Sequence, residues 1–137
     1  LETLSMRVSR MAESAQAIAE FLSSNKKVTK VNYPGLKNHP GHDVAKKQMS
    51  GFGTTLSFEV NGGMVGLFKV MNGLRVIDIS NNLGDSKSLI THPASSTHRR
   101  LDEETRKAMG ITDSLARLSV GLEHPDDLIK DLEKALQ

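Results

Sequence analysis

The sequence contains no cysteine, no tryptophan and only one tyrosine among its 137 residues. Without cysteine the chain forms neither a disulfide scaffold nor a thiolate zinc site, and a reducing, cytoplasmic compartment is the simplest expectation. No apolar run approaches the ~18 residues that a membrane helix needs, and no secretory leader is visible. We therefore expect one soluble globular domain without a membrane partner.

A strong charge of either sign is also missing. Eighteen basic and sixteen acidic residues leave a net charge of +2. The basic residues form scattered pairs rather than one stripe, as at Lys26-Lys27, Lys46-Lys47 and Arg99-Arg100. Few aromatic side chains are available to stack on bases, so solvated surface charge explains these pairs better than a nucleic-acid partner.

The clearest expected element is an amphipathic helix over residues 1–22. Its apolar positions recur every three or four residues, at Leu1, Leu4, Val8, Met11, Ala15, Ile18 and Leu22. Packing on the chain's own sheet, a coiled-coil seam and a docking face for another protein all fit this spacing. No capping residue precedes Leu1, so we expect the helix to continue from an earlier segment of a longer protein.

Four segments are expected to form strands, because their side chains alternate or are apolar throughout. They span residues 28–33, 54–60, 74–79 and 116–120, and 74–79 is expected to be a central strand. Further helices are expected over 43–49, 64–71, 102–107 and 125–136. In the second of these, Val65, Phe68 and Met71 should face inward. This order of elements predicts a two-layer α/β sandwich with a four-stranded sheet.

Residues 81–100 form a long polar connection after the third expected strand. The segment has no hydrophobic period, so we expect no core element within it. A compact domain seldom keeps so long a connection without a function, and rigid scaffolds hold binding groups on such loops. Its Asn, Ser, Thr, His and Arg side chains are of the types that bind carboxylates and phosphates.

Few of the remaining residues form a known chemical motif. There is no phosphate loop, nucleophile elbow or dinucleotide fingerprint. His39, His42, His92 and His98 lack a recognised metal-ligand spacing, so we expect them to brace loops rather than to bind a metal.

Arg117 has two open interpretations: a solvated outward residue of a strand, or a clamp whose planar guanidinium binds both oxygens of a carboxylate.

Several ordered motifs resemble the Cys/Met-metabolism family of pyridoxal-phosphate (PLP) enzymes. They run through the whole chain and are Tyr33-Pro34-Gly35-Leu36, His39-Pro40, His42, Gln48-Met49-Ser50-Gly51-Phe52-Gly53, Ser88-Leu89-Ile90, His92-Pro93-Ala94-Ser95, Thr97-His98 and Arg117-Leu118-Ser119-Val120-Gly121-Leu122-Glu123. The resemblance implies that residues 1–137 are the small C-terminal domain of a fold-type I (aspartate aminotransferase-like) enzyme. Such a domain has a mostly antiparallel sheet with helices on one face.

In that family the large N-terminal domain carries the Schiff-base lysine and the phosphate-binding segment, and neither motif occurs in this chain. The resemblance therefore implies no catalytic, cofactor-binding or metal-binding residue here. Pyridoxal 5'-phosphate would be bound by the missing domain, and the fragment alone would be inactive. The intact enzyme would be a homotetramer in which this domain meets its own large domain and a small amino-acid substrate.

Three substrate-binding residues are implied by the same resemblance. The family's arginine for the substrate carboxylate falls on Arg117. A serine that helps to bind that carboxylate falls on Asn82, whose amide still donates a hydrogen bond. A threonine near the substrate falls on Thr97. Asn81 stands where cystathionine gamma-lyases tend to have an acidic residue, and this favours the O-succinylhomoserine sulfhydrylases.

The implied reaction is a γ-replacement that makes homocysteine from O-succinylhomoserine and sulfide, a step of methionine biosynthesis by transsulfuration or direct sulfhydrylation. Cystathionine gamma-synthase, methionine gamma-lyase and O-acetylhomoserine sulfhydrylase are alternatives within the family, which spans transferases and lyases. The alternative from another class is a stand-alone, non-catalytic ligand-binding module.

Overall fold

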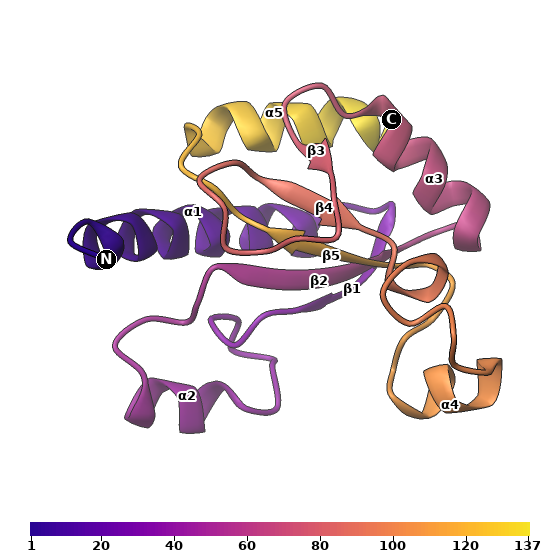
Figure 1. Ribbon diagram of the computed structural model, residues 1–137, viewed down its shortest axis with the longest axis horizontal. Coiled ribbons are helices and arrows are strands. Elements are labelled where there is room, and N and C mark those ends of the chain that lie inside the picture. Colours follow the sequence, from indigo (N-terminus) through magenta and orange to yellow (C-terminus); the bar gives the residue numbers. More distant parts are fainter.

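A computed structural model describes all residues from 1 to 137. The elements follow in the order α1 (Leu4–Ser24), β1 (Val28–Asn32), α2 (His42–Gln48), β2 (Thr55–Val60), α3 (Gly63–Gly73), β3 (Asp78–Ile79), β4 (Leu89–Thr91), the 3-10 turn η1 (Pro93–Ser95), α4 (Glu103–Ala108), β5 (Leu115–Ser119) and α5 (Pro125–Ala135). Helices α1, α3 and α5 lie on one side of the sheet, and the short helices α2 and α4 lie on the other side (Figure 1). None of the helices has the length and hydropathy that a membrane crossing requires.

The sheet has five strands in the order β1-β2-β5-β4-β3. All neighbours are antiparallel except β3 and β4, which are parallel. The predicted class, a mostly antiparallel sheet covered by helices on one face, is thus confirmed, and the predicted number of four strands is wrong by one. Strand β5 is central, which places its side chains between β2 and β4.

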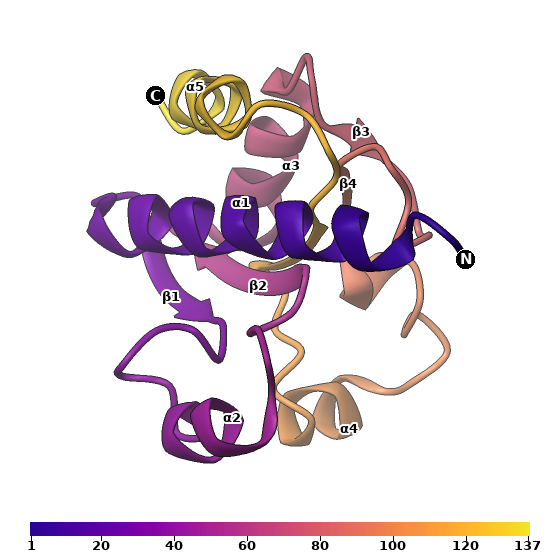
Figure 2. The same cartoon turned by 90° about the vertical axis from the view of Figure 1, so that its left-hand side faces the viewer.

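The core forms where alternate strand residues meet the three covering helices. Leu56, Phe58 and Val60 of β2 are buried, as the alternation predicts. Register places Leu56 opposite Leu118 of β5, which in turn lies opposite Ile90 of β4. These side chains join one cluster of 22 buried hydrophobic residues that includes positions from α1, α3 and α5. Figure 2 shows α1 crossing in front of the sheet, with α3 and α5 above it.

The expected central strand over 74–79 is absent; only Asp78–Ile79 forms a strand, and it lies at the sheet edge. The reason is a competing acceptor on α5. The buried carboxylate of Asp131 accepts hydrogen bonds from the backbone N–H groups of Arg75, Val76 and Ile77 at 2.8, 2.9 and 3.0 Å. Because each backbone N–H needs one partner, these three are not available to a sheet ladder.

The expectation of no core element within 81–100 is also wrong. Leu89, Ile90 and Thr91 form β4 and are buried. Strand β4 is only three residues long, and polar residues flank it, so its sequence carries no readable period. The segment is therefore two shorter loops, 81–88 and 92–100, on either side of an inner strand.

Two predicted apolar faces are partly exposed. Leu1 precedes α1 and is exposed, and Leu4 and Val8 of α1 are exposed too, because the first turns extend past the sheet (Figure 1). Only the later positions of the pattern, from Met11 onward, reach the core. In α3, Val65 and Phe68 are exposed, and the buried positions are Leu67, Val70 and Met71. The buried set follows the helical spacing i, i+3, i+4 and includes Met71, which was expected to face inward.

Candidate functional site

Arg117 lies in the middle of a polar row on the sheet face that α1, α3 and α5 leave open. Register places Asn32 opposite Ser57, Ser57 opposite Arg117, and Arg117 opposite Thr91. Directly opposed residues point to the same face, so four strands each contribute one polar side chain to this row. Asn32 donates to the Ser57 hydroxyl at 3.3 Å. A strand at the centre of a sheet is a rigid base for a binding group.

The Arg117 guanidinium is held at one end and free at the other. Its Nη2 donates to the carbonyl oxygens of Asn81 and Asn82, at 2.7 and 3.2 Å. Its Nε–H is buried and has no hydrogen-bond partner. A buried, unpaired donor on a cation is costly unless a ligand pairs with it. A carboxylate suits these remaining donors, because an ionised acceptor forms the stronger, charge-assisted hydrogen bonds with a guanidinium.

A hollow of about 290 Å³ opens beside Arg117. Thr97 and His98 line it from the loop after β4, and Asn32 and Ser57 line it from the polar row. The Thr97 hydroxyl and Nδ1 of His98 are 2.8 Å apart. The structure therefore brings Thr97 and Arg117, two of the three predicted site residues, to the same hollow.

The third predicted residue, Asn82, reaches Arg117 in a way that the sequence does not show. Its backbone carbonyl accepts from the guanidinium, and its exposed side chain does not line the hollow. Its backbone N–H donates to the Ser80 hydroxyl at 3.3 Å. Asn82 thus helps to hold the arginine, and a direct contact of its amide with a substrate stays a prediction.

Sequence reasoning missed a set of residues that fasten loop 81–88 to β5. Every second residue from 117 to 123 bonds to that loop. After Arg117, Ser119 accepts from Gly84 N at 2.8 Å, Gly121 N donates to the Ser88 hydroxyl at 2.9 Å, and Glu123 accepts twice from Ser88. The available signal was the polar alternation of Arg-Leu-Ser-Val-Gly-Leu-Glu, which continues past the end of the strand.

His92 braces the turn that leads to Thr97. Its ring is buried and lies between the Ser95 hydroxyl, 2.8 Å from Nδ1, and the Asp113 carbonyl, 3.0 Å from Nε2. The ring also meets the edge of Phe68 with centroids 5.1 Å apart. Burial lowers the pKa of His92, and the Asp113 carbonyl opposes this effect. An imidazole with both nitrogens engaged has a bracing role, as the sequence predicted.

No group of three or more His, Asp or Glu residues in the chain is arranged to hold a metal ion. The other histidines have local partners. Nδ1 of His42 lies 2.8 Å from the Pro34 carbonyl, His39 accepts from Gly41 N, and His124 accepts from Asp126 N at the start of α5. These contacts fix turns and a helix end, in agreement with the expected loop-bracing role.

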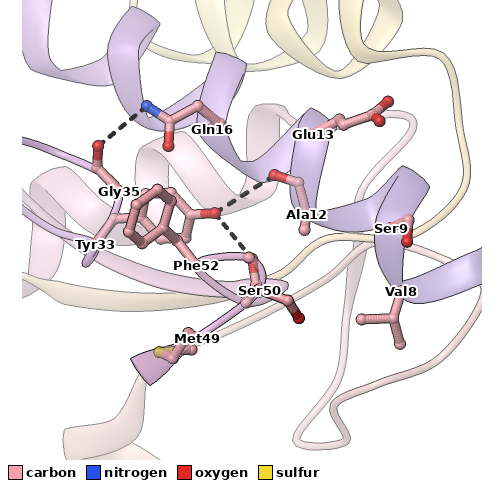
Figure 3. Close-up of a pocket in the computed structure, with 12 residues that line it drawn as sticks. Val8, Ser9, Ala12, Glu13, Gln16, Tyr33, Gly35, Met49, Ser50 and Phe52 are labelled. Atoms are coloured by element: carbon pink, nitrogen blue, oxygen red, sulfur yellow. Dashed lines mark hydrogen bonds between the residues drawn. The ribbon is translucent and has the colours of Figure 1, made fainter. Parts of the chain in front are cut away.

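A larger hollow of about 790 Å³ lies between α1 and residues 49–53 (Figure 3). Neither lysine nor arginine lines it, and Glu13 is its charged residue. Its main polar groups are already engaged: the Tyr33 hydroxyl lies 2.9 Å from the Gly53 carbonyl, and Gln16 donates to the Gly35 carbonyl. Burial raises the pKa of Tyr33 to about 12, so this phenol is neutral. For an anionic substrate the hollow at Arg117 is therefore the better candidate.

Comparison with known proteins gives the family. Residues 1–137 match the family described as Cys/Met metabolism PLP-dependent enzyme. An O-succinylhomoserine sulfhydrylase of Mycobacterium tuberculosis is 51% identical over 99% of this chain, which covers 34% of that protein. An L-methionine gamma-lyase of Fusobacterium nucleatum is 46% identical over the whole chain and 35% of that protein.

The fold is similar to solved members of the same family. A cystathionine gamma synthase from Xanthomonas oryzae pv. oryzae, solved with aminoacrylate and cysteine, superposes with a TM-score of 0.95 at 45% identity. The match covers 99% of this chain and 35% of that one. The chain thus spans about a third of the length of its relatives, 34–35% in these three cases. The chain belongs to the Cys/Met metabolism family of PLP-dependent enzymes.

Proposed function

We propose that this chain is the C-terminal, substrate-binding domain of a PLP-dependent enzyme that makes homocysteine from O-succinylhomoserine and sulfide. The observation that carries the proposal is the half-anchored Arg117 guanidinium, whose buried Nε–H lacks a partner beside a polar hollow. The group that fits it is the α-carboxylate of an amino acid. The 51% identity to an O-succinylhomoserine sulfhydrylase supports the choice of substrate.

The residues around Arg117 do not fit the cofactor itself. A PLP enzyme holds its cofactor as an imine on a lysine, and no lysine lines the hollow. The role of this chain is therefore recognition of substrate. Arg117 binds the α-carboxylate through its free donors, and Thr97 stands at the same hollow as a hydroxyl donor. Holding the carboxylate fixes the orientation of the rest of the amino acid, and fixed orientation is a large part of catalysis.

The proposal includes a second domain and an assembly. The intact protein would be a cytoplasmic homotetramer, and a large domain preceding residues 1–137 would supply the lysine and bind pyridoxal 5'-phosphate. A reading frame upstream of Leu1 that encodes a Ser-x-Thr-Lys motif would support this arrangement. A frame that begins with a capped helix near Leu1 and has no such motif would favour the stand-alone ligand-binding module.

Replacement of Arg117 tests the clamp. In the full-length enzyme, Arg117→Ala should raise KM strongly and lower kcat, with kcat/KM falling about 10²- to 10³-fold, because two charge-assisted hydrogen bonds are lost. Steady-state kinetics with O-succinylhomoserine and sulfide give both constants. Exposed Arg10 on α1 offers a matched control, Arg10→Ala, which should leave kcat/KM unchanged. An unchanged kcat/KM in Arg117→Ala would remove the clamp assignment.

Methionine gamma-lyase is the second candidate, because one such enzyme is 46% identical to this chain. Product analysis separates the two. With O-succinylhomoserine and sulfide, a sulfhydrylase releases succinate and forms homocysteine. With methionine alone, a gamma-lyase releases methanethiol, ammonia and 2-oxobutanoate. Parallel assays with O-acetylhomoserine, and with cysteine in place of sulfide, identify the ester and the thiol that the enzyme prefers.

A further inference from the structure

The direction of the Arg117 side chain depends on an exposed loop, whose first residue, Asn81, also accepts a hydrogen bond from the Thr91 hydroxyl at 2.8 Å. Residues 81–87 are all exposed, yet the carbonyl oxygens of Asn81 and Asn82 are the acceptors that hold the guanidinium. Movement of the loop would therefore move the arginine or release it. Whatever fixes loop 81–88 also fixes the orientation of the clamp.

Residues 84–88 of the loop are fixed by the end of β5 and by the chain that follows it. Gly84 N donates to the buried Ser119 hydroxyl at 2.8 Å, and Leu122 N donates to the Ser86 carbonyl at 2.8 Å. Gly121 makes close approach possible, since a Cβ at this position would overlap the Ser86 carbonyl oxygen and the Lys87 carbonyl carbon.

Glu123 provides the strongest of these attachments. Its Oε1 accepts from Ser88 N and its Oε2 accepts from the Ser88 hydroxyl, both at 2.8 Å. Ser88 is completely buried, and its hydroxyl also accepts from Gly121 N. Hydrogen bonds to an ionised carboxylate are about twice as strong as neutral ones. Loss of the carboxylate would leave two buried donors of Ser88 without partners, and the loop would lose its anchor.

We propose that Glu123 is a positioning residue for the substrate carboxylate: it anchors loop 81–88 through Ser88, and the loop holds the Arg117 guanidinium in its binding orientation. The proposal rests on the proposed function of Arg117 as the carboxylate clamp. Glu123 itself does not line the hollow and is not expected to touch substrate. It acts on binding of the amino acid, and the groups that carry out the chemistry are elsewhere.

A purely structural role of Glu123 makes a different prediction. If Glu123 only stabilised the fold, its removal would reduce the fraction of active enzyme, and so the apparent kcat, without changing KM. A positioning role raises KM while kcat changes little, because the carboxylate site is loosened in enzyme that remains folded. The conservative variant also discriminates, since a glutamine can accept from Ser88 N and donate to the Ser88 hydroxyl.

The test measures kcat, KM and the melting temperature of full-length enzyme carrying Glu123→Ala, Glu123→Gln or Ser88→Ala. A matched control is Glu133→Ala, on an exposed position of α5. Glu123→Ala should raise KM for O-succinylhomoserine about tenfold with kcat within about twofold, in line with one or two lost charge-assisted bonds. Glu123→Gln should restore KM to within about threefold of wild type, and Ser88→Ala should fall between the two. Glu133→Ala should change neither constant.

Three outcomes would decide against the inference. It is overturned if Glu123→Ala matches the control, if only the apparent kcat falls, or if glutamine fails to restore KM. If Glu123→Ala does not fold, Ser88→Ala and Glu123→Gln still give the comparison, and equal KM values in both would overturn the inference.

Failure of the carboxylate clamp is seen separately, in Arg117→Ala. If Arg117→Ala leaves KM unchanged, the proposed function fails; if it raises KM while the Glu123 and Ser88 variants do not, only this inference fails.

Discussion

The two faces of the same strands differ in what holds them together. On the covered face, Leu56, Phe58 and Leu118 pack against three helices without using a hydrogen bond. On the open face, the neighbouring positions Ser57 and Arg117 are half-buried and polar, and Arg117 is fixed by single contacts of defined geometry. One face depends on volume and apolar area, and the other depends on the identity of individual donors and acceptors.

The difference separates stability from function along one strand. The hydrophobic effect is nondirectional, so another apolar side chain of similar volume on the covered face keeps most of the stability. A guanidinium fork has no equivalent, because lysine lacks its planar pair of donors. A substitution at buried Leu118 should therefore mainly lower the free energy of unfolding. A substitution at the adjacent Arg117 should mainly weaken substrate binding.

The largest expected effect on stability is at Phe58. Phe58→Ala should lower the free energy of unfolding by about 3–5 kcal/mol, because the side chain is fully buried and leaves a cavity. The adjacent Ser57→Ala, on the open face, should lower it by less than about 1 kcal/mol, since it removes one half-buried hydroxyl contact. Urea unfolding followed by circular dichroism gives both values. Similar losses at the two positions would contradict the division between the faces.

The next largest effect is expected at Asp131, because this carboxylate is essential on the covered side of the sheet. Asp131→Ala should lower the free energy of unfolding by about 3 kcal/mol, since three backbone N–H groups lose their acceptor. Asp131→Asn should cost less, because its amide oxygen keeps one or two of these bonds. Hydrogen exchange of Arg75, Val76 and Ile77 should accelerate in both variants. Unchanged protection of these three amides would show that Asp131 is not their anchor.

The smallest effect concerns pH and His92, a titratable ring packed against Phe68 of α3. Burial lowers the pKa of His92 in the folded chain, with the ordinary value near 6.5 in the unfolded one. Above about pH 6.5 the ring is neutral in both states. As the pH falls below this value the unfolded chain takes up the proton first, so stability declines.

Unfolding curves from pH 7.5 to 5 should therefore show a steeper loss of stability in the wild type than in His92→Gln, which has no group titrating there. The variant is expected to be less stable at pH 7.5, because it loses one of the two ring contacts. Only the difference in slope tests the pKa. Parallel slopes would mean that His92 titrates normally in the folded chain.

The sequence pattern was sufficient where side-chain period and burial agree. Strand β2 and the later turns of α1 follow directly from the spacing of Leu56, Phe58, Ile18 and Leu22. It failed where a distant partner decides. Residues 75–77 are apolar enough for a strand, but Asp131, which is 54 to 56 positions away, takes their N–H groups. No local pattern contains that information.

The site was predictable only in part for a similar reason. Alternation placed Arg117 outward, and resemblance to the family selected it as a clamp together with Asn82 and Thr97. The polar row and the contacts of loop 81–88 depend on register between strands that are distant in sequence. Glu123 was not recognised because its partner Ser88 lies 35 residues earlier, in a segment that showed no period.

The role of Arg117 is tested most directly by two affinities of the full-length enzyme. One is for an unreactive amino acid, such as norleucine, and the other is for the corresponding amine that lacks the carboxylate. Arg117→Ala should weaken binding of the amino acid about 100-fold and leave binding of the amine unchanged, because only the carboxylate loses its partner. Equal weakening of both ligands, or no weakening of the amino acid, would contradict the assignment of Arg117 as the carboxylate clamp.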